Sequence, residues 1–141
     1  MENKHILNKG NSGWCSVKID EFSGSASYVT DVPMDFLNAF KIFIDTGAIP
    51  VVFCDEEGSE FRIIVEEFYT YIISEREDAK LIVVEMDRRE FVDTILSDIE
   101  GELDWFAVEF ADDITDENDV LQRKINILTT IQYIRNNFEV F

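Results

Sequence analysis

Basic residues are scarce in this sequence, and one long stretch has none. The 141 residues include 12 Lys and Arg against 30 Asp and Glu, which gives a formal net charge of −18. Between Glu90 and Gln122 there are 12 acids and no base. A field of this sign repels DNA, RNA and anionic membrane surfaces, and it speeds encounter with basic molecules. We therefore expect neither nucleic acid nor a membrane as a direct partner.

Residues that carry metal and redox chemistry are also few. The two cysteines, Cys15 and Cys54, lack CxxC spacing, so we expect small buried thiols in a reducing compartment, with a single disulfide as the alternative. The only histidine, His5, lies in a polar N-terminal segment, where a frayed terminal residue is expected and a general base is not. No GxSxG, HExxH, P-loop or Rossmann motif occurs. These absences predict a protein without a cofactor and without enzymatic activity.

Long apolar runs are missing as well. No run approaches the length of a membrane span, and the N-terminus has no apolar segment of the signal-peptide type, so a cytoplasmic protein is expected. A hydrophobic content of 46% with 12 Phe is nevertheless enough for a packed core. We predict a single α+β domain over residues 1–141, with residues 1–12 flexible.

Local patterns predict a mostly antiparallel β-sheet of about five to six strands, with helices packed on one face. The segments 14–22 and 25–32 alternate around Ser23-Gly24 and predict a hairpin. Pro33 suits a first helical position, and apolar residues at helical spacing continue from it to a stop at Gly47. Residues 51–54 and 61–65 predict a second hairpin, and 68–74 and 80–86 predict two further strands.

The C-terminal part of the chain reads as helical. Asp87 and Glu90 have the spacing of a capping box, and an apolar stripe continues through Gly101 to about Ala111. One long helix is the preferred interpretation; the alternative ends the helix at Gly101 and makes "WFAVEF" a strand. A last helix is expected to begin near Thr115 or Asp116.

The candidate site lies in the stretch without bases. As part of a helix or of a strand, Trp105 is expected to leave the main apolar face and to lie among carboxylates. Such an arrangement favours a protein-binding surface in which the indole anchors and the acids meet Lys or Arg of a partner. The predicted partner-binding residues are Trp105, Glu109, Asp112, Asp113, Asp116, Glu117 and Asp119.

Two other interpretations of this stretch stay open. The acids can be an ordinary solvated face, with Trp105 tucked under a loop or under the last helix. A metal site is the second alternative, but "DDITDENDV" lacks the glycine and the terminal glutamate of a calcium loop, so no metal is expected.

A second candidate surface lies on the predicted strands. Tyr69 and Tyr71 share one face with Ile73 and could form an exposed ridge beside Glu66 and Glu67. The preferred interpretation is that these tyrosines belong to the apolar half of a sheet and are covered by a helix.

The segment "DFLNAFKIFIDTGAIPVVFCDEEGSEFRIIV" predicts a helix, a glycine and a hairpin with an acidic turn. With the stretch from Glu90 to Gln122, it resembles in organisation the small acidic bacterial immunity proteins, which neutralise polymorphic or contact-dependent toxins, many of them basic nucleases. The resemblance implies an inhibitor that binds a basic toxin tightly, covers its active site or an essential surface, and performs no chemistry. It assigns no role to any residue. The alternative function is a small regulatory or structural interaction module, homodimeric through the last helix or a sheet edge.

Overall fold

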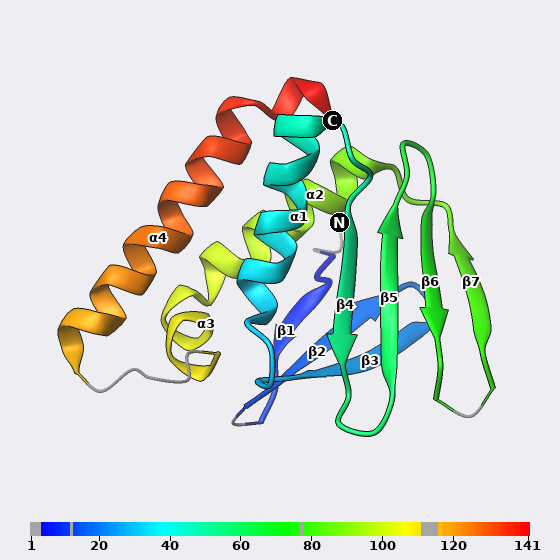
Figure 1. Ribbon diagram of the computed structural model, residues 1–141, viewed down its shortest axis with the longest axis horizontal. Coiled ribbons are helices and arrows are strands. Elements are labelled where there is room, and N and C mark those ends of the chain that lie inside the picture. The colour runs from blue at the N-terminus through cyan, green and yellow to red at the C-terminus, as the bar shows by residue number, and fades with distance from the viewer. Residues whose placement is uncertain (1–3, 12, 77, 111–115) are drawn as a thin grey trace.

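The computed structural model describes residues 4–11, 13–76, 78–110 and 116–141. Two antiparallel sheets and four α-helices make up this part of the chain (Figure 1), which confirms the α+β class. The elements, in chain order, are β1 (Leu7–Lys9), β2 (Trp14–Ile19), β3 (Phe22–Ser27), α1 (Val32–Thr46), β4 (Val51–Asp55), β5 (Glu60–Val65), β6 (Thr70–Ser74), β7 (Lys80–Val84), α2 (Arg88–Gly101), α3 (Leu103–Glu109), α4 (Glu117–Asn136) and a terminal 3₁₀ turn, η1 (Phe138–Val140).

The strands form two sheets instead of the single sheet that the sequence predicts. One sheet has the order β1-β2-β3 and the other β4-β5-β6-β7, and every pair is antiparallel. The predicted number of five to six strands is therefore wrong, since seven are present among the described residues. In Figure 1 the blue hairpin β2–β3 crosses behind β4–β7, and α1 lies beside β4.

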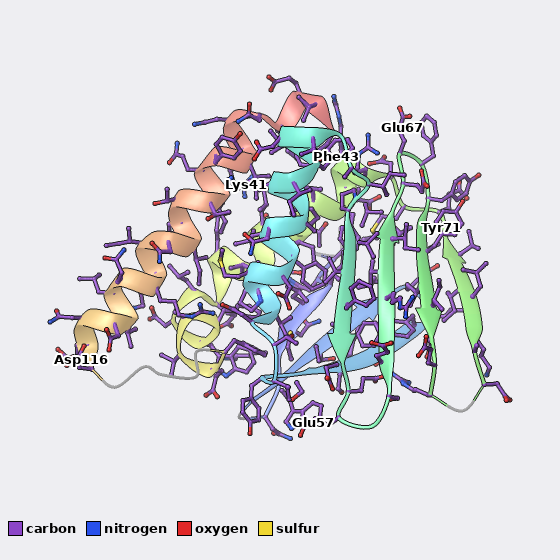
Figure 2. All side chains as sticks on the ribbon, viewed as in Figure 1. Lys41, Phe43, Glu57, Glu67, Tyr71 and Asp116 are labelled. Atoms are coloured by element: carbon purple, nitrogen blue, oxygen red, sulfur yellow. The ribbon has the colours of Figure 1, made fainter. Side chains whose placement is uncertain are left out.

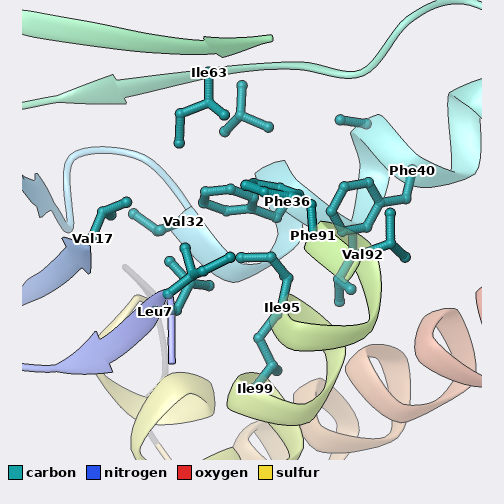
Figure 3. Packing of buried hydrophobic residues seen from close by; sticks show 14 of the residues in the cluster. Leu7, Val17, Val32, Phe36, Phe40, Ile63, Phe91, Val92, Ile95 and Ile99 are labelled. Carbon is teal, nitrogen blue, oxygen red and sulfur yellow. The ribbon is translucent and has the colours of Figure 1, made fainter. Parts of the chain in front are cut away.

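One hydrophobic cluster joins both sheets and the helices (Figure 3). Phe91 of α2 lies at its centre, with ring centroids 6.2 Å from Phe36 and 6.1 Å from Phe40 of α1. Ile63 approaches from β5, and Val17 from β2. Each fully buried Phe or Ile contributes about 2–3 kcal/mol relative to exposure, so this cluster is what holds the two sheets together.

The predicted helix after Pro33 is confirmed. Pro33 occupies its first turn, where the absent backbone N–H leaves no hydrogen bond unmade. Gly47 ends the helix with φ of 79°, and its N–H donates to the Phe43 carbonyl. A left-handed residue at this position favours glycine because it has no Cβ to clash.

The first hairpin is present, but its turn was predicted at the wrong place. The chain reverses at Asp20 and Glu21, with Asp20 at φ of 55°, while Ser23 and Gly24 lie inside β3. Gly24 faces the other sheet. A Cβ there would lie 2.7 Å from Cε1 of Phe61, so glycine marks a close approach between the sheets instead of a turn.

Residues 7–9 of the N-terminal segment predicted to be flexible form a strand. Leu7, Asn8 and Lys9 pair with β2, and Ile6 and Leu7 are buried. The carboxylate of Asp98 in α2 accepts the N–H groups of Ile6 at 2.7 Å and Leu7 at 2.9 Å. That carboxylate is 1% exposed and also lies 2.7 Å from His5 Nδ1, so the expectation of a frayed His5 is wrong. The anchor comes from a residue more than ninety positions away, which local sequence patterns cannot reveal.

The helix after Asp87 is shorter than predicted. Asp87 caps α2 by accepting from the Glu90 N–H at 2.8 Å, as the capping-box spacing predicts. The helix then ends at Gly101, because Glu102 leaves helical geometry with φ of −130° and ψ of 42°. A separate helix, α3, covers Leu103–Glu109, so both the continuous helix and the strand are wrong for this segment. The last helix, α4, begins after Asp116, as predicted.

Candidate functional site

Trp105 does not point away from the apolar core as predicted. Its indole is partly buried and packs edge-to-face against Phe106 and Phe110, with ring centroids 5.1 and 5.5 Å apart. The reason is the break at Glu102: α3 begins anew there, so its rotation is not fixed by the apolar stripe of α2. Trp105 is therefore partly accessible and packed against the core.

The predicted acids have roles that local structure accounts for. Asp116 caps α4 by accepting from the Asp119 N–H at 3.0 Å, and Glu117 and Asp119 lie in the first turn of that helix. Negative charge there is favoured by the helix dipole. Glu109 accepts from the Gly13 N–H at 3.1 Å. Asp112 and Asp113, also predicted, lie outside the described residues.

The stretch that has no bases in the sequence does have bases around it in the fold. Lys and Arg residues from both ends of the chain pair with five of its acids. The ion pairs are Lys4–Glu90, Lys9–Glu102, Lys124–Asp104, Arg135–Asp93 and Arg135–Glu100. At least five of the 12 carboxylates in this stretch are therefore paired with Lys or Arg within the molecule, and none of these five is a predicted partner-binding residue.

Arg123, immediately after the acidic stretch, is a structural residue. Its guanidinium donates to both carboxylate oxygens of Asp31, at 2.7 and 2.5 Å, and to the Ala107 carbonyl at 2.9 Å. A bidentate pair of this kind fixes orientation as well as distance. Arg123 thus joins α4 to α3 and to the residue that precedes α1.

A different surface stands out on the four-stranded sheet. We call it the outer sheet face. It consists of two rows of cross-strand neighbours that point away from the core. The first row is Val51, Ile64, Tyr71 and Val83, and the second is Phe53, Arg62, Ile73 and Leu81. Leu81 is 63% exposed and Phe53 52% exposed, and no helix of the described chain covers either.

The outer sheet face corrects the preferred interpretation of the tyrosines. Tyr71 lies on this face, at the side of the molecule opposite Asp116 (Figure 2), and its ring centroid is 6.5 Å from that of Tyr69. Both rings are at least partly accessible to solvent. The sequence contained a signal for this arrangement. The runs "RIIV", "YIIS" and "LIVV" are apolar at both strand parities, which indicates two apolar faces instead of one.

The three-stranded sheet has a polar outer face, unlike the four-stranded sheet. Its outward positions carry Asn8, Ser16, Lys18, Ser23 and Ser25, and its inward positions carry Cys15, Val17 and Ala26. Antiparallel sheets with one solvated face normally show this polar-out pattern. The outer sheet face departs from that pattern within the same molecule.

Acidic rows lie beyond both ends of the outer sheet face. Asp55 pairs with Glu60, and the Glu75 N–H donates to the Glu60 carbonyl at 3.1 Å, which places three acids at one end. Glu66 and Glu85 follow β5 and β7 at the other end. Within the face, Arg62 is the one base among the described residues. It pairs with Glu60 at 3.4 Å and with Glu75 at 3.7 Å.

In the described ranges, no group of three His, Cys, Asp or Glu side chains has a geometry that could hold a metal ion. One open depression of about 560 Å³ is lined by Arg89, Glu90, Asp93, Arg135 and Phe138 with Asp87, where Arg135 pairs with Asp93. Cys15 and Cys54 are both buried as free thiols. No helix in the described part of the chain combines the length and the apolar character that crossing a membrane requires.

No protein-family model matches this sequence, and no curated protein or solved structure is significantly similar to it. Its function therefore has to be argued from its own residues.

Proposed function

We propose that this chain is a non-catalytic immunity protein, which neutralises a basic toxin by binding it. The observation that carries the proposal is the distribution of charge. At least eight of the 12 Lys and Arg residues form ion pairs with acids of the same molecule. With its bases engaged internally and a net charge of −18, the surface presented to a partner is acidic.

A surface of this kind suits the capture of a basic protein. A nuclease that grips a polyanion must present Lys and Arg, and carboxylates can compete for the same patch. Long-range attraction raises the rate of association, and salt screens it over a Debye length of about 8 Å at physiological ionic strength. Inhibition by occupancy needs no nucleophile, no metal and no cofactor.

The proposal is tested first in cells and then in solution. We expect co-expression to protect cells from the toxin domain encoded beside this gene in its genome, in particular the basic C-terminal domain of a large secreted protein. The association rate should fall by about tenfold or more between 50 and 300 mM NaCl. If co-expression fails to protect the cells, the proposed function is wrong. If the association rate does not depend on salt, the electrostatic mechanism is wrong.

A small interaction module that dimerises is the second candidate. The observation that favours it is apolar surface left exposed on β7 and on α4, including Leu81 and Leu121. Sedimentation equilibrium distinguishes the two: a stable homodimer with no effect on toxicity supports the module and contradicts the immunity function.

A further inference from the structure

We propose that the outer sheet face is the docking surface for the partner, and that the partner presents an apolar strip flanked on both sides by Lys and Arg. This inference rests on the proposed function and assigns its binding surface. It replaces the surface around Trp105, whose ring is packed against Phe106 and Phe110.

The outer sheet face leaves apolar area uncovered in the free chain. Area that stays in contact with water adds nothing to the hydrophobic stabilisation of the fold, so covering it would be favourable. The largest contiguous apolar patch on a soluble protein is often a functional site, whereas isolated exposed side chains need no explanation. Here the most exposed residues lie at the two ends of continuous cross-strand rows. Arg62 and Ile73 connect Phe53 to Leu81, and Ile64 and Tyr71 connect Val51 to Val83.

The outer sheet face has the size of the centre of a protein interface. Four strands about 4.8 Å apart and about five residues long, at about 3.3 Å per residue, give a face of roughly 300 Å² in projection. A stable interface buries about 800 Å² of accessible surface on each partner. The face can therefore supply the apolar centre of an interface, and the acidic rows beyond both strand ends supply its rim.

The charges within and around the outer sheet face determine which kind of partner fits it. Arg62 lies 4.9 Å from the Phe53 ring centroid and is paired with Glu60 and Glu75, so its single positive charge offsets one of the three carboxylates at that end. A partner therefore meets an apolar strip between acidic rows. Lys and Arg at matching positions would find carboxylates at both ends, as rim charges do in electrostatically steered complexes.

The same geometry disfavours a second copy of this chain as the occupant. Packing two outer sheet faces together would bring acidic rim against acidic rim, in a molecule that already carries −18. Like charges brought together at an interface are unfavourable. Anionic lipid and nucleic acid are repelled for the same reason.

The test uses two synthetic β-hairpin peptides as probes. Both present Val, Phe and Leu on one face; one has lysines at its strand ends and the other has glutamates. We expect the lysine hairpin to shift NMR signals of residues 51–85 and to bind more weakly as salt rises, while the glutamate hairpin does not bind. Equal binding of both hairpins, no binding of either, or shifts confined to α3 and α4 would overturn the proposal.

Variants locate the binding. Phe53→Thr with Leu81→Thr keeps strand propensity and should weaken binding of the lysine hairpin at least tenfold. The matched control, Leu121→Gln with Ile125→Gln, removes comparably exposed apolar groups from α4 and should change binding less than twofold. Glu85→Lys, a charge reversal at an exposed rim position, should weaken binding severalfold without touching the apolar rows. The assignment of the binding surface is wrong if the α4 variant weakens binding more than the Phe53→Thr, Leu81→Thr variant does. It is also wrong if the wild-type chain forms a dimer and the Phe53→Thr, Leu81→Thr substitutions dissociate that dimer.

Protection of cells separates this inference from the proposed function. If the Phe53→Thr, Leu81→Thr variant protects as well as the wild-type chain does, the surface is wrong and the function stands. If the lysine hairpin binds the outer sheet face but the wild-type chain gives no protection, the function is wrong and the surface stands.

Discussion

The guanidinium of Arg62 lies over the ring of Phe53, with 4.9 Å between the guanidinium carbon and the ring centroid. Both residues are on the outer sheet face, opposite each other on β5 and β4. The contact shields part of the ring and holds the charge close to Glu60 and Glu75. An apolar sheet face with one internally compensated base and acids at both ends is the feature on which the account of binding depends.

Asp98 is the polar residue on which the N-terminal strand most depends. Replacing it with Asn puts an amide donor or a neutral oxygen where two backbone N–H groups and His5 need a carboxylate. We expect Asp98→Asn to lower the free energy of unfolding by about 2–3 kcal/mol in urea titrations, because the buried N–H groups lose a charged acceptor. Asp93→Asn, at an exposed position of the same helix, should change it by less than about 0.5 kcal/mol. Equal effects of the two substitutions would argue against the anchor.

Substitution of two glycines by alanine should change the stability of the fold in opposite directions. At Gly24 the added Cβ would lie 2.7 Å from Phe61 and 2.8 Å from Phe22, so Gly24→Ala should destabilise the fold by about 1–3 kcal/mol. At Gly101 nothing lies within 4 Å, and the residue is in α2, so Gly101→Ala should stabilise it by up to about 1 kcal/mol. Chemical denaturation measures both variants. A neutral Gly24→Ala would contradict the close approach of the two sheets.

The thiols should be unreactive while the protein is folded. Burial raises the pKa of Cys15 to about 12 and also raises the pKa of Cys54. At pH 8 the thiolate fraction of Cys15 should then be lower by a factor on the order of 1,000 than that of a thiol with the ordinary pKa of 9.0. Labelling with a disulfide reagent should be slow in buffer and fast for both thiols in guanidinium. Rapid stoichiometric labelling of the folded chain would show that one of these sites opens.

The contact between Asp45 and Tyr133 links α1 to α4 and gives a pH prediction. The Tyr133 hydroxyl donates to Asp45 Oδ1 at 2.5 Å. This bond, together with Lys41, lowers the pKa of Asp45 below 3.8. The same bond and the Asp45 charge raise the pKa of Tyr133 above 10.0. Because the pKa of Asp45 is lower in the folded chain than in the unfolded chain, this carboxylate stabilises the fold fully above about pH 4. The stabilisation is lost as the pH falls through the pKa of the folded chain. The pKa of Tyr133 is higher in the folded chain than in the unfolded chain, so its hydroxyl stabilises the fold fully below about pH 10. This stabilisation is lost as the pH rises through the pKa of the folded chain.

Substitution of Tyr133 tests this contact. In an NMR titration, Tyr133→Phe should move the pKa of Asp45 up toward 3.8, while Tyr28→Phe, at an exposed position elsewhere, should leave it unchanged. An Asp45 titration that is identical in the wild-type chain and in Tyr133→Phe would contradict the hydrogen bond.

Sequence patterns predicted the parts of the fold that local physics determines. Pro33 and Gly47 bound α1, Asp87 and Asp116 cap their helices, and the hairpin of β4 and β5 has the expected partners. The errors occur where a distant residue decides. Gly24 resembles a turn residue until Phe61 is placed against it, and residues 7–9 look loose until Asp98 holds them.

The candidate site was harder to predict for the same reason. A gap in the distribution of bases along the sequence says nothing about bases that folding brings back, and Lys9, Lys124 and Arg135 return to that stretch. The composition of β4–β7 did indicate two apolar faces, but only the arrangement of helices shows which face is left uncovered. Tyr71 was therefore assigned to the covered side.

Hydroxyl-radical footprinting tests the central claim most directly, since it reports the solvent access of individual side chains in the free chain and in its complex with the toxin that it neutralises. Complex formation should reduce oxidation of Phe53 and Leu81 several-fold and leave Leu121 unchanged. Protection of Trp105 and Leu121, with Phe53 and Leu81 as reactive as in the free chain, would place the partner on α3 and α4 and contradict the account.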